Sequence, residues 1–316
     1  MLQKQAALLV GLSIARVCMC AAQPAGGADH PHPMYHYPRW SPDGTRIVVV
    51  SISAGESHLL VIPVAGGSAR SIETPKIAPM AADWISSNRI SIVGHSTADA
   101  QTSFAIDIDG KNLRPFRRDS IASATRDSSI LLYEAQRSGG SDIVSTDRQR
   151  RASRQLTRGF WAEQPSISPD QRQIVFEKRV DPNRMDRSEV VVMALDGSGQ
   201  VTIAAGTDPS WSPDGKQILF KSMDARGMLW ISVVDVATRA VRRLTLGVHP
   251  EWSPTGDRIL FMRDGTGGDG EVYVVSASGG DSRCLTCSLA QRKRPVTQTP
   301  SPREGRHALP AKPEVR

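Results

Sequence analysis

The sequence predicts an all-β fold, a six-bladed β-propeller of four-stranded antiparallel blades. The first observation is a short phrase, most complete in "SWSPDGKQILFKS", which recurs about every 40 residues, a period typical of propeller repeats. The second is the run of apolar and β-branched residues that follows each copy, as expected of short strands. Aligned on the Trp of the phrase, the copies centre on Trp40, Trp84, Ser123, Ile167, Trp211 and Trp252.

The phrase has the composition of a tight turn between two strands. Pro fixes φ at the second turn position, Asp accepts hydrogen bonds within the turn, and Gly supplies the positive φ that closes a hairpin. We therefore expect Asp43, Asp170 and Asp214 to cap turns rather than to serve catalysis or metal binding. The Trp before the turn is placed to fill the wedge between adjacent sheets, where burial of an aromatic ring stabilises packing.

The rest of each unit predicts two further strands. After the run that follows the phrase comes a polar turn and a second apolar run, such as "LWISVVD" or "EVYVVSA". A Gly- or Asp-containing turn follows, and several units close with a short segment ending in Leu-Thr, as in "RQLT", "RRLT" and "RCLT". With the strand that leads into the phrase, this makes four strands in each unit.

The segment "HPEWSPTGDRILFMRDG…EVYVVSASGG…RCLT" resembles the repeat of TolB-type propellers, which also occurs in the propeller domains of prolyl oligopeptidase-like peptidases. The resemblance covers residues 37–286. The last three units match it closely, whereas the second and third keep only the strand pattern. TolB carries an α/β domain before its propeller and the peptidases carry a hydrolase domain, so the resemblance implies the propeller alone.

The two ends of the chain differ in composition from its middle. Residues 1–22 have the order of a signal peptide, with Lys4, an apolar run and small residues, which predicts a periplasmic or secreted protein. A short membrane anchor and lipidation at Cys18 or Cys20 are the alternatives. We expect residues 23–36 to be a flexible segment, 37–287 the six-bladed propeller and 288–316 a disordered tail.

The basic tail holds most of the excess positive charge. The chain has a formal net charge of +7, but residues 23–291 carry none of it. The tail and the Arg-rich stretch 147–159 lack the interleaved aromatic residues of single-strand nucleic-acid binders, so we expect no nucleic-acid partner. A weak contact of the tail with anionic surfaces is the remaining option.

Two cysteines, Cys284 and Cys287, lie near the end of the last unit in "CLTC". Two thiols form at most half of a zinc site, and a redox CxxC motif normally opens a helix after a strand. A local disulfide or two free thiols is the interpretation that fits an oxidising compartment.

Sequence motifs for catalysis are absent. The string "GHSTA" lacks the second Gly of a nucleophile elbow, and no P-loop, dinucleotide fingerprint or HExxH motif occurs. His30, His32 and His36, with His249, form the one histidine group that could hold a divalent metal. Because two prolines interrupt this stretch, we expect a linker there, with no cofactor and no metal.

The position three residues before the Trp is where the repeat stops repeating. Its residues should surround one mouth of a central channel, and unlike side chains in a ring are what a binding site needs. Exposure without any constraint is the simpler explanation. The ring is Tyr37, Ala81, Ser120, Gln164, Asp208 and His249, and its neighbours are His36, Met80, Asp119, Glu163, Thr207 and Val248. The candidate partner-binding residues are Tyr37, Gln164, Asp208, His249, Glu163 and His36.

The function predicted from these features is protein binding. We expect an exported, non-catalytic interaction or scaffold module of the cell envelope, monomeric, whose partner is an envelope protein or peptide. The first alternative is a metal-dependent lyase or hydrolase of the propeller type, with its site at the central channel. A second alternative makes the tail the working part.

Overall fold

The structure is a computed structural model, and it describes residues 33–53, 55–96, 102–116, 123–125, 129–147, 152–179, 181, 187–264 and 270–291. These residues form strands almost throughout, and the helix α1 (Cys287–Gln291) follows the last strand. The all-β class predicted from the sequence is therefore confirmed.

Four sheets contain four antiparallel strands each, in sequence order. The first comprises β1 (Met34–Trp40), β2 (Arg46–Ser53), β3 (Glu56–Pro63) and β4 (Arg70–Ile72). The second comprises β5 (Ile77–Ser86), β6 (Arg89–Ser96), β7 (Thr102–Asp107) and β8 (Arg114–Pro115). The last two comprise β17 (Thr207–Trp211), β18 (Gln217–Met223), β19 (Leu229–Asp235) and β20 (Val241–Leu246), then β21 (Val248–Trp252), β22 (Arg258–Asp264), β23 (Gly270–Ser276) and β24 (Arg283–Cys284).

The middle of the chain forms one sheet of eight strands. Its first half is β9 (Ser123–Ala124), β10 (Ile130–Arg137), β11 (Gly140–Asp147) and β12 (Ser153–Gln155). Its second half is β13 (Trp161–Ile167), β14 (Gln173–Arg179), β15 (Glu189–Ala194) and β16 (Val201–Ala205). The halves join through the parallel pair Ser141 and Trp161 between β11 and β13. Below, units 1 to 6 are the successive groups of four strands.

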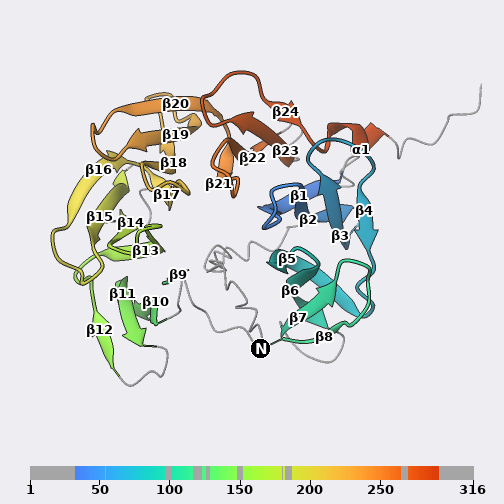
Figure 1. Ribbon diagram of the computed structural model, residues 1–316, viewed down its shortest axis with the longest axis horizontal. Helices are drawn as coiled ribbons and strands as arrows, with labels where there is room; N and C mark the ends of the chain where they lie inside the picture. Colours follow the sequence, from blue (N-terminus) through green and yellow to red (C-terminus); the bar gives the residue numbers. More distant parts are fainter. Residues whose placement is uncertain are drawn as a thin grey trace, which may run out of the picture.

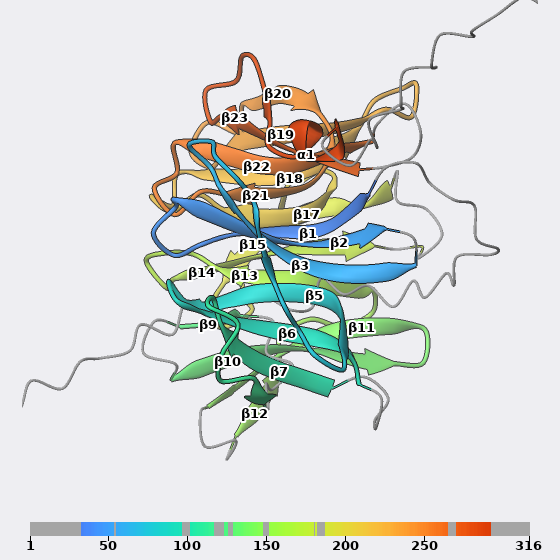
Figure 2. The same cartoon turned by 90° about the vertical axis from the view of Figure 1, so that its right-hand side faces the viewer.

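The sheets surround a common centre, with the first strand of each unit innermost (Figure 1). The side view in Figure 2 shows β1, β2 and β3 between the strands of units 6 and 2. Accordingly β1 contacts β5 on one side and β21, β22 and β23 on the other, so the last unit meets the first.

The hydrophobic core lies between sheets rather than at the centre. Each buried apolar cluster combines side chains of two neighbouring units: Val48 of unit 1 packs with Trp84 of unit 2, and Phe176 of unit 4 packs in a cluster with Leu132 of unit 3. The cluster that holds Trp40 and Val274 joins units 1 and 6. Each unit therefore shares a buried cluster with at least one neighbour, as expected of a repeat protein.

The predicted turn caps are confirmed. In unit 5, Ser212 Oγ and the backbone N–H of Lys216 both donate to Asp214 Oδ1, at 2.6 and 3.0 Å. The N–H of Gln217 in turn donates to Ser212 Oγ at 2.9 Å. The hydrogen bonds from Ser212 and Lys216 lower the pKa of Asp214. Asp43 and Asp170 accept the corresponding bonds in their own turns.

The Trp side chains fill the spaces between sheets, as predicted. Trp211 is 7% exposed, and its indole N–H donates to the carbonyl of Ser166 in unit 4, at 3.1 Å. The acceptor belongs to the residue just before the Trp position of the preceding unit. The same link joins three further neighbouring pairs, namely Trp84 to Arg39, Trp252 to Ser210, and Trp40 to Glu251 across the junction of units 1 and 6.

The turn glycines add a second contact between units. Gly256 has φ of 76°, and a Cβ at this position would lie 3.2 Å from the ring of Pro213 in the preceding turn. Gly44 lies against Pro254 in the same way, so the turn of unit 1 also packs on the turn of unit 6. Gly suits this position because it adopts positive φ without strain, although Gln171 occupies it in unit 4 with φ of 61°.

Two sequence expectations need adjustment. In unit 3 the Trp position belongs to Ala124 rather than Ser123, because Thr125 N–H bonds Ile130 O just as Ser212 N–H bonds Gln217 O. The boundaries of the propeller also differ by a few residues from those expected. β1 begins at Met34, within the segment 23–36 expected to be flexible, and α1 crosses the expected boundary at residue 287.

We predict that Trp211→Ala lowers the free energy of unfolding by about 3–5 kcal/mol, because a buried aromatic ring and a bond between units are lost. Trp211→Phe keeps most of the ring burial and should lose less. Trp230→Ala is the control, since the Trp230 indole bonds Asp224 within its own unit. Urea unfolding measures the three variants, and a loss below about 1 kcal/mol for Trp211→Ala would contradict the packing described here.

Candidate functional site

Four residues share an unusual backbone conformation, and each lies three positions before the Trp or, in unit 4, before Ile167. Tyr37, Gln164, Asp208 and His249 have φ of 48°, 53°, 56° and 52°. Each lies at a β-bulge between the first and second strands of its unit, and each is followed by Pro. Positive φ is uncommon for residues other than Gly and costs about 1–3 kcal/mol where the surroundings enforce it. We call these four residues the rim.

The rim residues are members of the ring predicted from the sequence, but the other two members differ. Ala81 does not adopt positive φ, and its unit lacks the following Pro. Ser120 lies outside the described residues, as does its neighbour Asp119. The register found for unit 3 also moves the equivalent position away from Ser120.

Rim side chains of neighbouring units contact each other in two pairs. Gln164 Nε2 donates to Asp208 Oδ1 at 2.5 Å, which joins units 4 and 5. The rings of Tyr37 and His249 meet edge to face, with centroids 5.6 Å apart, which joins units 1 and 6. The structure thus places the predicted residues in a polar pair and an aromatic pair.

A network of charged side chains surrounds the polar pair. Asp208 forms an ion pair with Lys221 at 3.0 Å, and both side chains are largely buried. Arg179 pairs with Glu163, a predicted site residue, and with Glu177 at 3.0 Å. Removing one member would leave an opposite charge buried without its partner, which is costly.

Glutamates of the preceding unit hold the backbone of two rim residues. The N–H of Gln164 donates to Glu134 Oε1 at 2.7 Å, and the N–H of Asp208 donates to Glu177 Oε2 at 3.2 Å. Glu134 and Glu177 occupy the same position on the second strands β10 and β14. Sequence reasoning missed both. The available signal was a glutamate within an apolar strand run, in "ILLYEAQ" and "QIVFEKR".

Burial changes the acid strength of these two glutamates. It raises the pKa of Glu177 to about 7, and the negative charge of Asp208 adds to the rise. Burial also raises the pKa of Glu134, against the opposing effects of the Gln164 N–H and of Arg179. The site therefore contains a carboxyl group that changes charge near neutral pH, which is a common feature of functional sites.

The histidine side of the site is less polar. Burial lowers the pKa of His36, which favours its neutral form, and His36 Nε2 has no hydrogen-bond partner among the described residues. Neither His36 nor His249 belongs, within the described part of the chain, to a group of three donor side chains close enough to share an ion. His30 and His32, the other histidines of the predicted metal group, lie outside it.

Comparison with protein families decides the relationship of this chain. The model of the TolB beta propeller domain matches residues 30–207, more than half of the sequence. The chain belongs to this family. None of the curated proteins matches the sequence.

Solved TolB structures share the fold. TolB from Acinetobacter baumannii superposes with a TM-score of 0.54 at 17% identity, over 81% of this chain and 66% of that one. A putative TolB from Agrobacterium tumefaciens gives 0.50 at 22% identity, over 77% and 90%. This chain thus spans just under two thirds of the first protein. At these identities the likeness concerns the fold of the TolB beta propeller domain. Among the described residues, no helix has the length and apolarity to cross a membrane.

We predict that the pH dependence of stability changes in Glu177→Gln. Folding raises the pKa of Glu177 from 4.5 to about 7, so the folded state binds more protons in this interval and loses stability as pH rises through it. The variant cannot titrate, and its stability relative to the wild type should improve by on the order of 3 kcal/mol between about pH 4 and pH 8.

Urea unfolding at stepped pH measures this difference. The control is Glu73→Gln, which changes an exposed glutamate outside the site. A difference between Glu177→Gln and wild type that stays constant with pH would show that folding does not raise the pKa of Glu177.

Proposed function

We propose that this protein is a non-catalytic binding module of the cell envelope that receives a partner protein or peptide at the rim. Membership of the TolB beta propeller domain family supports a propeller scaffold. The proposal of an exported location rests on the signal-like residues 1–22.

The observation that carries the proposal is the combination of strained backbone and unlike side chains at one position of the repeat. The four rim residues share φ values within a narrow range, yet their side chains are aromatic, amide, acidic and imidazole. The turn at the other end of the same strands instead keeps its Ser, Pro and Asp in three units. A site built for recognition needs this variety on a fixed backbone, whereas a structural turn does not.

The chemistry of the rim suggests which partner groups it would accept. Gln164 Oε1 and the hydroxyl of Thr207 are buried without a hydrogen-bond partner among the described residues. Thr207 is next to Asp208 and only 5% exposed. Buried polar atoms usually have partners, so these two acceptors are suited to hydrogen bonds from a ligand. The Tyr37–His249 pair offers an aromatic surface, whereas the network around Asp208 offers charged groups.

The proposal includes six four-stranded blades. It counts the eight-stranded sheet as two blades, because β11 and β13 share only the pair Ser141 and Trp161 while every other neighbour in the sheet pairs antiparallel. It also retains the expected order of a signal, a short linker, the propeller and a disordered basic tail, with the propeller beginning at Met34.

The test is a triple variant, Gln164→Ala, Asp208→Ala and His249→Ala, compared with the wild type in capture of partners from envelope extract. We expect capture to fall at least about tenfold, as loss of several central contacts costs more than 1.4 kcal/mol. Because Asp208→Ala also leaves Lys221 unpaired, a second triple variant with Asp208→Asn limits the loss of stability. Melting temperatures report the fold of both.

The matched control changes exposed residues in the turns at the other end of the strands, Thr45→Ala, Lys216→Ala and Thr255→Ala. Equal capture by the rim variants and the wild type, with unchanged melting temperatures, would exclude the rim as the partner site. A stoichiometric metal ion in the untagged protein would favour the lyase or hydrolase alternative instead.

A further inference from the structure

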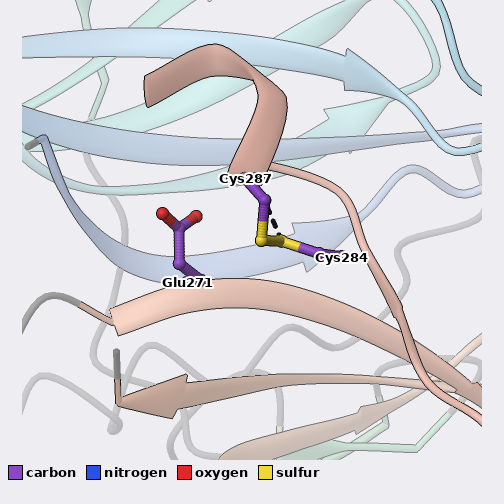
Figure 3. Close-up of side chains that lie close together, drawn as sticks. All are labelled: Glu271, Cys284 and Cys287. Carbon is purple, nitrogen blue, oxygen red and sulfur yellow. Dashed lines mark hydrogen bonds between the residues drawn. A yellow bond between two sulfur atoms is a disulfide. The ribbon is translucent and has the colours of Figure 1, made fainter. Parts of the chain in front are cut away.

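Cys284 and Cys287 form a disulfide at the end of unit 6. Cys284 ends β24 and Cys287 begins α1, and both residues are partly exposed. The backbone N–H of Cys287 donates to Cys284 Sγ at 3.0 Å, shown as a dashed line in Figure 3. The Tyr273 hydroxyl lies 3.7 Å from Cys287 Sγ. Hydrogen-bond donors at a sulfur stabilise its thiolate form once the disulfide is reduced.

A carboxyl group accompanies the disulfide. Glu271, at the start of β23, lies beside the two sulfurs in Figure 3, with a carboxylate oxygen within 4.8 Å of both. Thr286, between the cysteines, donates its hydroxyl hydrogen to Glu271 Oε2 and accepts the N–H of Val272 at 3.0 Å. The carboxylate is thus held in place next to the S–S bond.

Unit 3 contains the same hydrogen-bond arrangement around a Thr side chain, but without cysteines. There Thr157 Oγ1 accepts the N–H of Ile143, as Thr286 does for Val272. This match places Asp142 at the position of Glu271, and Gln155 and Arg158 at the positions of the two cysteines. Gln155 Nε2 donates to Asp142 Oδ2 at 2.7 Å, and Arg158 donates to Gln155 Oε1 at 3.0 Å.

The comparison separates what the fold requires from what unit 6 adds. A single Gln–Arg hydrogen bond closes this segment in unit 3, so this arrangement itself does not need a covalent link. A disulfide across three residues also restricts the unfolded chain less than one that closes a long loop. Stabilisation therefore accounts poorly for a disulfide at this position.

We propose that Cys284 and Cys287 are a redox-active pair that exchanges with thiols and disulfides, with Glu271 as its proton acceptor. In reduction, an external thiolate attacks Cys287 Sγ, the S–S bond breaks, and its electron pair leaves on Cys284, next to the N–H of Cys287. A second thiolate attacks the external sulfur and releases Cys287. Two external thiols thereby become one disulfide, and the protein gains two electrons.

Oxidation reverses these steps. Glu271 takes the proton of the Cys287 thiol, and the resulting thiolate attacks an external disulfide and releases one thiolate. The Cys284 thiolate then attacks Cys287 Sγ, which restores the S–S bond and releases the second external thiolate. One of the released thiolates receives the proton from Glu271, so the carboxyl group returns to its starting form.

The experiment equilibrates the full chain with reduced and oxidised glutathione at a series of ratios, then alkylates free thiols and maps the peptides, which separates this pair from Cys18 and Cys20. We expect a reversible transition with a midpoint inside the series. Glu271→Gln keeps an acceptor for Thr286 but cannot take a proton, so it should slow reoxidation about a hundredfold near neutral pH and flatten the pH–rate profile.

The double variant Cys284→Gln, Cys287→Arg copies the unit 3 link and is the structural control. We expect it to keep the wild-type melting temperature and to show no exchange. A pair that stays oxidised at every glutathione ratio would overturn the proposal, as would wild-type rates in Glu271→Gln. A large fall in the melting temperature of the double variant would identify the disulfide as a structural link instead.

Discussion

The contact of Trp40, Trp84, Trp211 and Trp252 with the preceding unit is the interaction on which the rest of the structure depends. Each ring is buried between two sheets, and each indole N–H bonds the backbone just before the corresponding position of the neighbour. A sheet in this fold cannot bury its faces alone, so the link sets the spacing of one unit on the next. At the junction of the two chain ends Trp40 bonds Glu251 O, and Arg258 lies over the Trp40 ring at 5.3 Å. The last unit is therefore joined to the first by the same contact that joins units 1 and 2, units 4 and 5, and units 5 and 6.

The two ends of the innermost strands contribute differently to the structure. At the turn end the Ser–Asp bonds recur in units 1, 4 and 5, and the Gly–Pro contacts involve the glycines of units 1, 5 and 6. At the rim end four units share a strained backbone with positive φ, and their side chains differ. Glu134 and Glu177 oppose this strain by accepting the N–H groups of Gln164 and Asp208. The proposed partner site and its buried charges thus depend on packing and hydrogen bonds between neighbouring units.

The features that sequence reasoning predicted well are local and repeated. Asp214 caps its turn because the bonded atoms lie within four residues, and the recurrence of Trp in units 1, 2, 5 and 6 identified its packing role. The rim residues were selected from the sequence because their identities vary at a position where the repeat is otherwise aligned. The register of unit 3 was wrong by one residue, since "TRDSS" lacks the Pro and Gly that align the other turns.

What could not be predicted depends on contacts between units or between distant strands. Glu177 meets Asp208 across 31 residues, and nothing in the phrase marks it. The spacing of Cys284 and Cys287 allowed a disulfide, free thiols or part of a metal site, and Glu271 joins them only through the pairing of β23 with β24. The comparison with Gln155 and Arg158 likewise needed the hydrogen bonds of both Thr residues.

The central claim is that a regular ring presents its binding surface at the rim end. Site-specific photo-crosslinking tests it most directly, with a photoreactive residue at exposed Met80 beside the ring or at exposed Thr255 in the turn of unit 6. The account predicts crosslinks to a partner in envelope extract from Met80, and their loss when an excess of unlabelled protein competes. Crosslinks from Thr255 with none from Met80 would contradict it, because the partner would then contact the end of the ring where the repeat is constant.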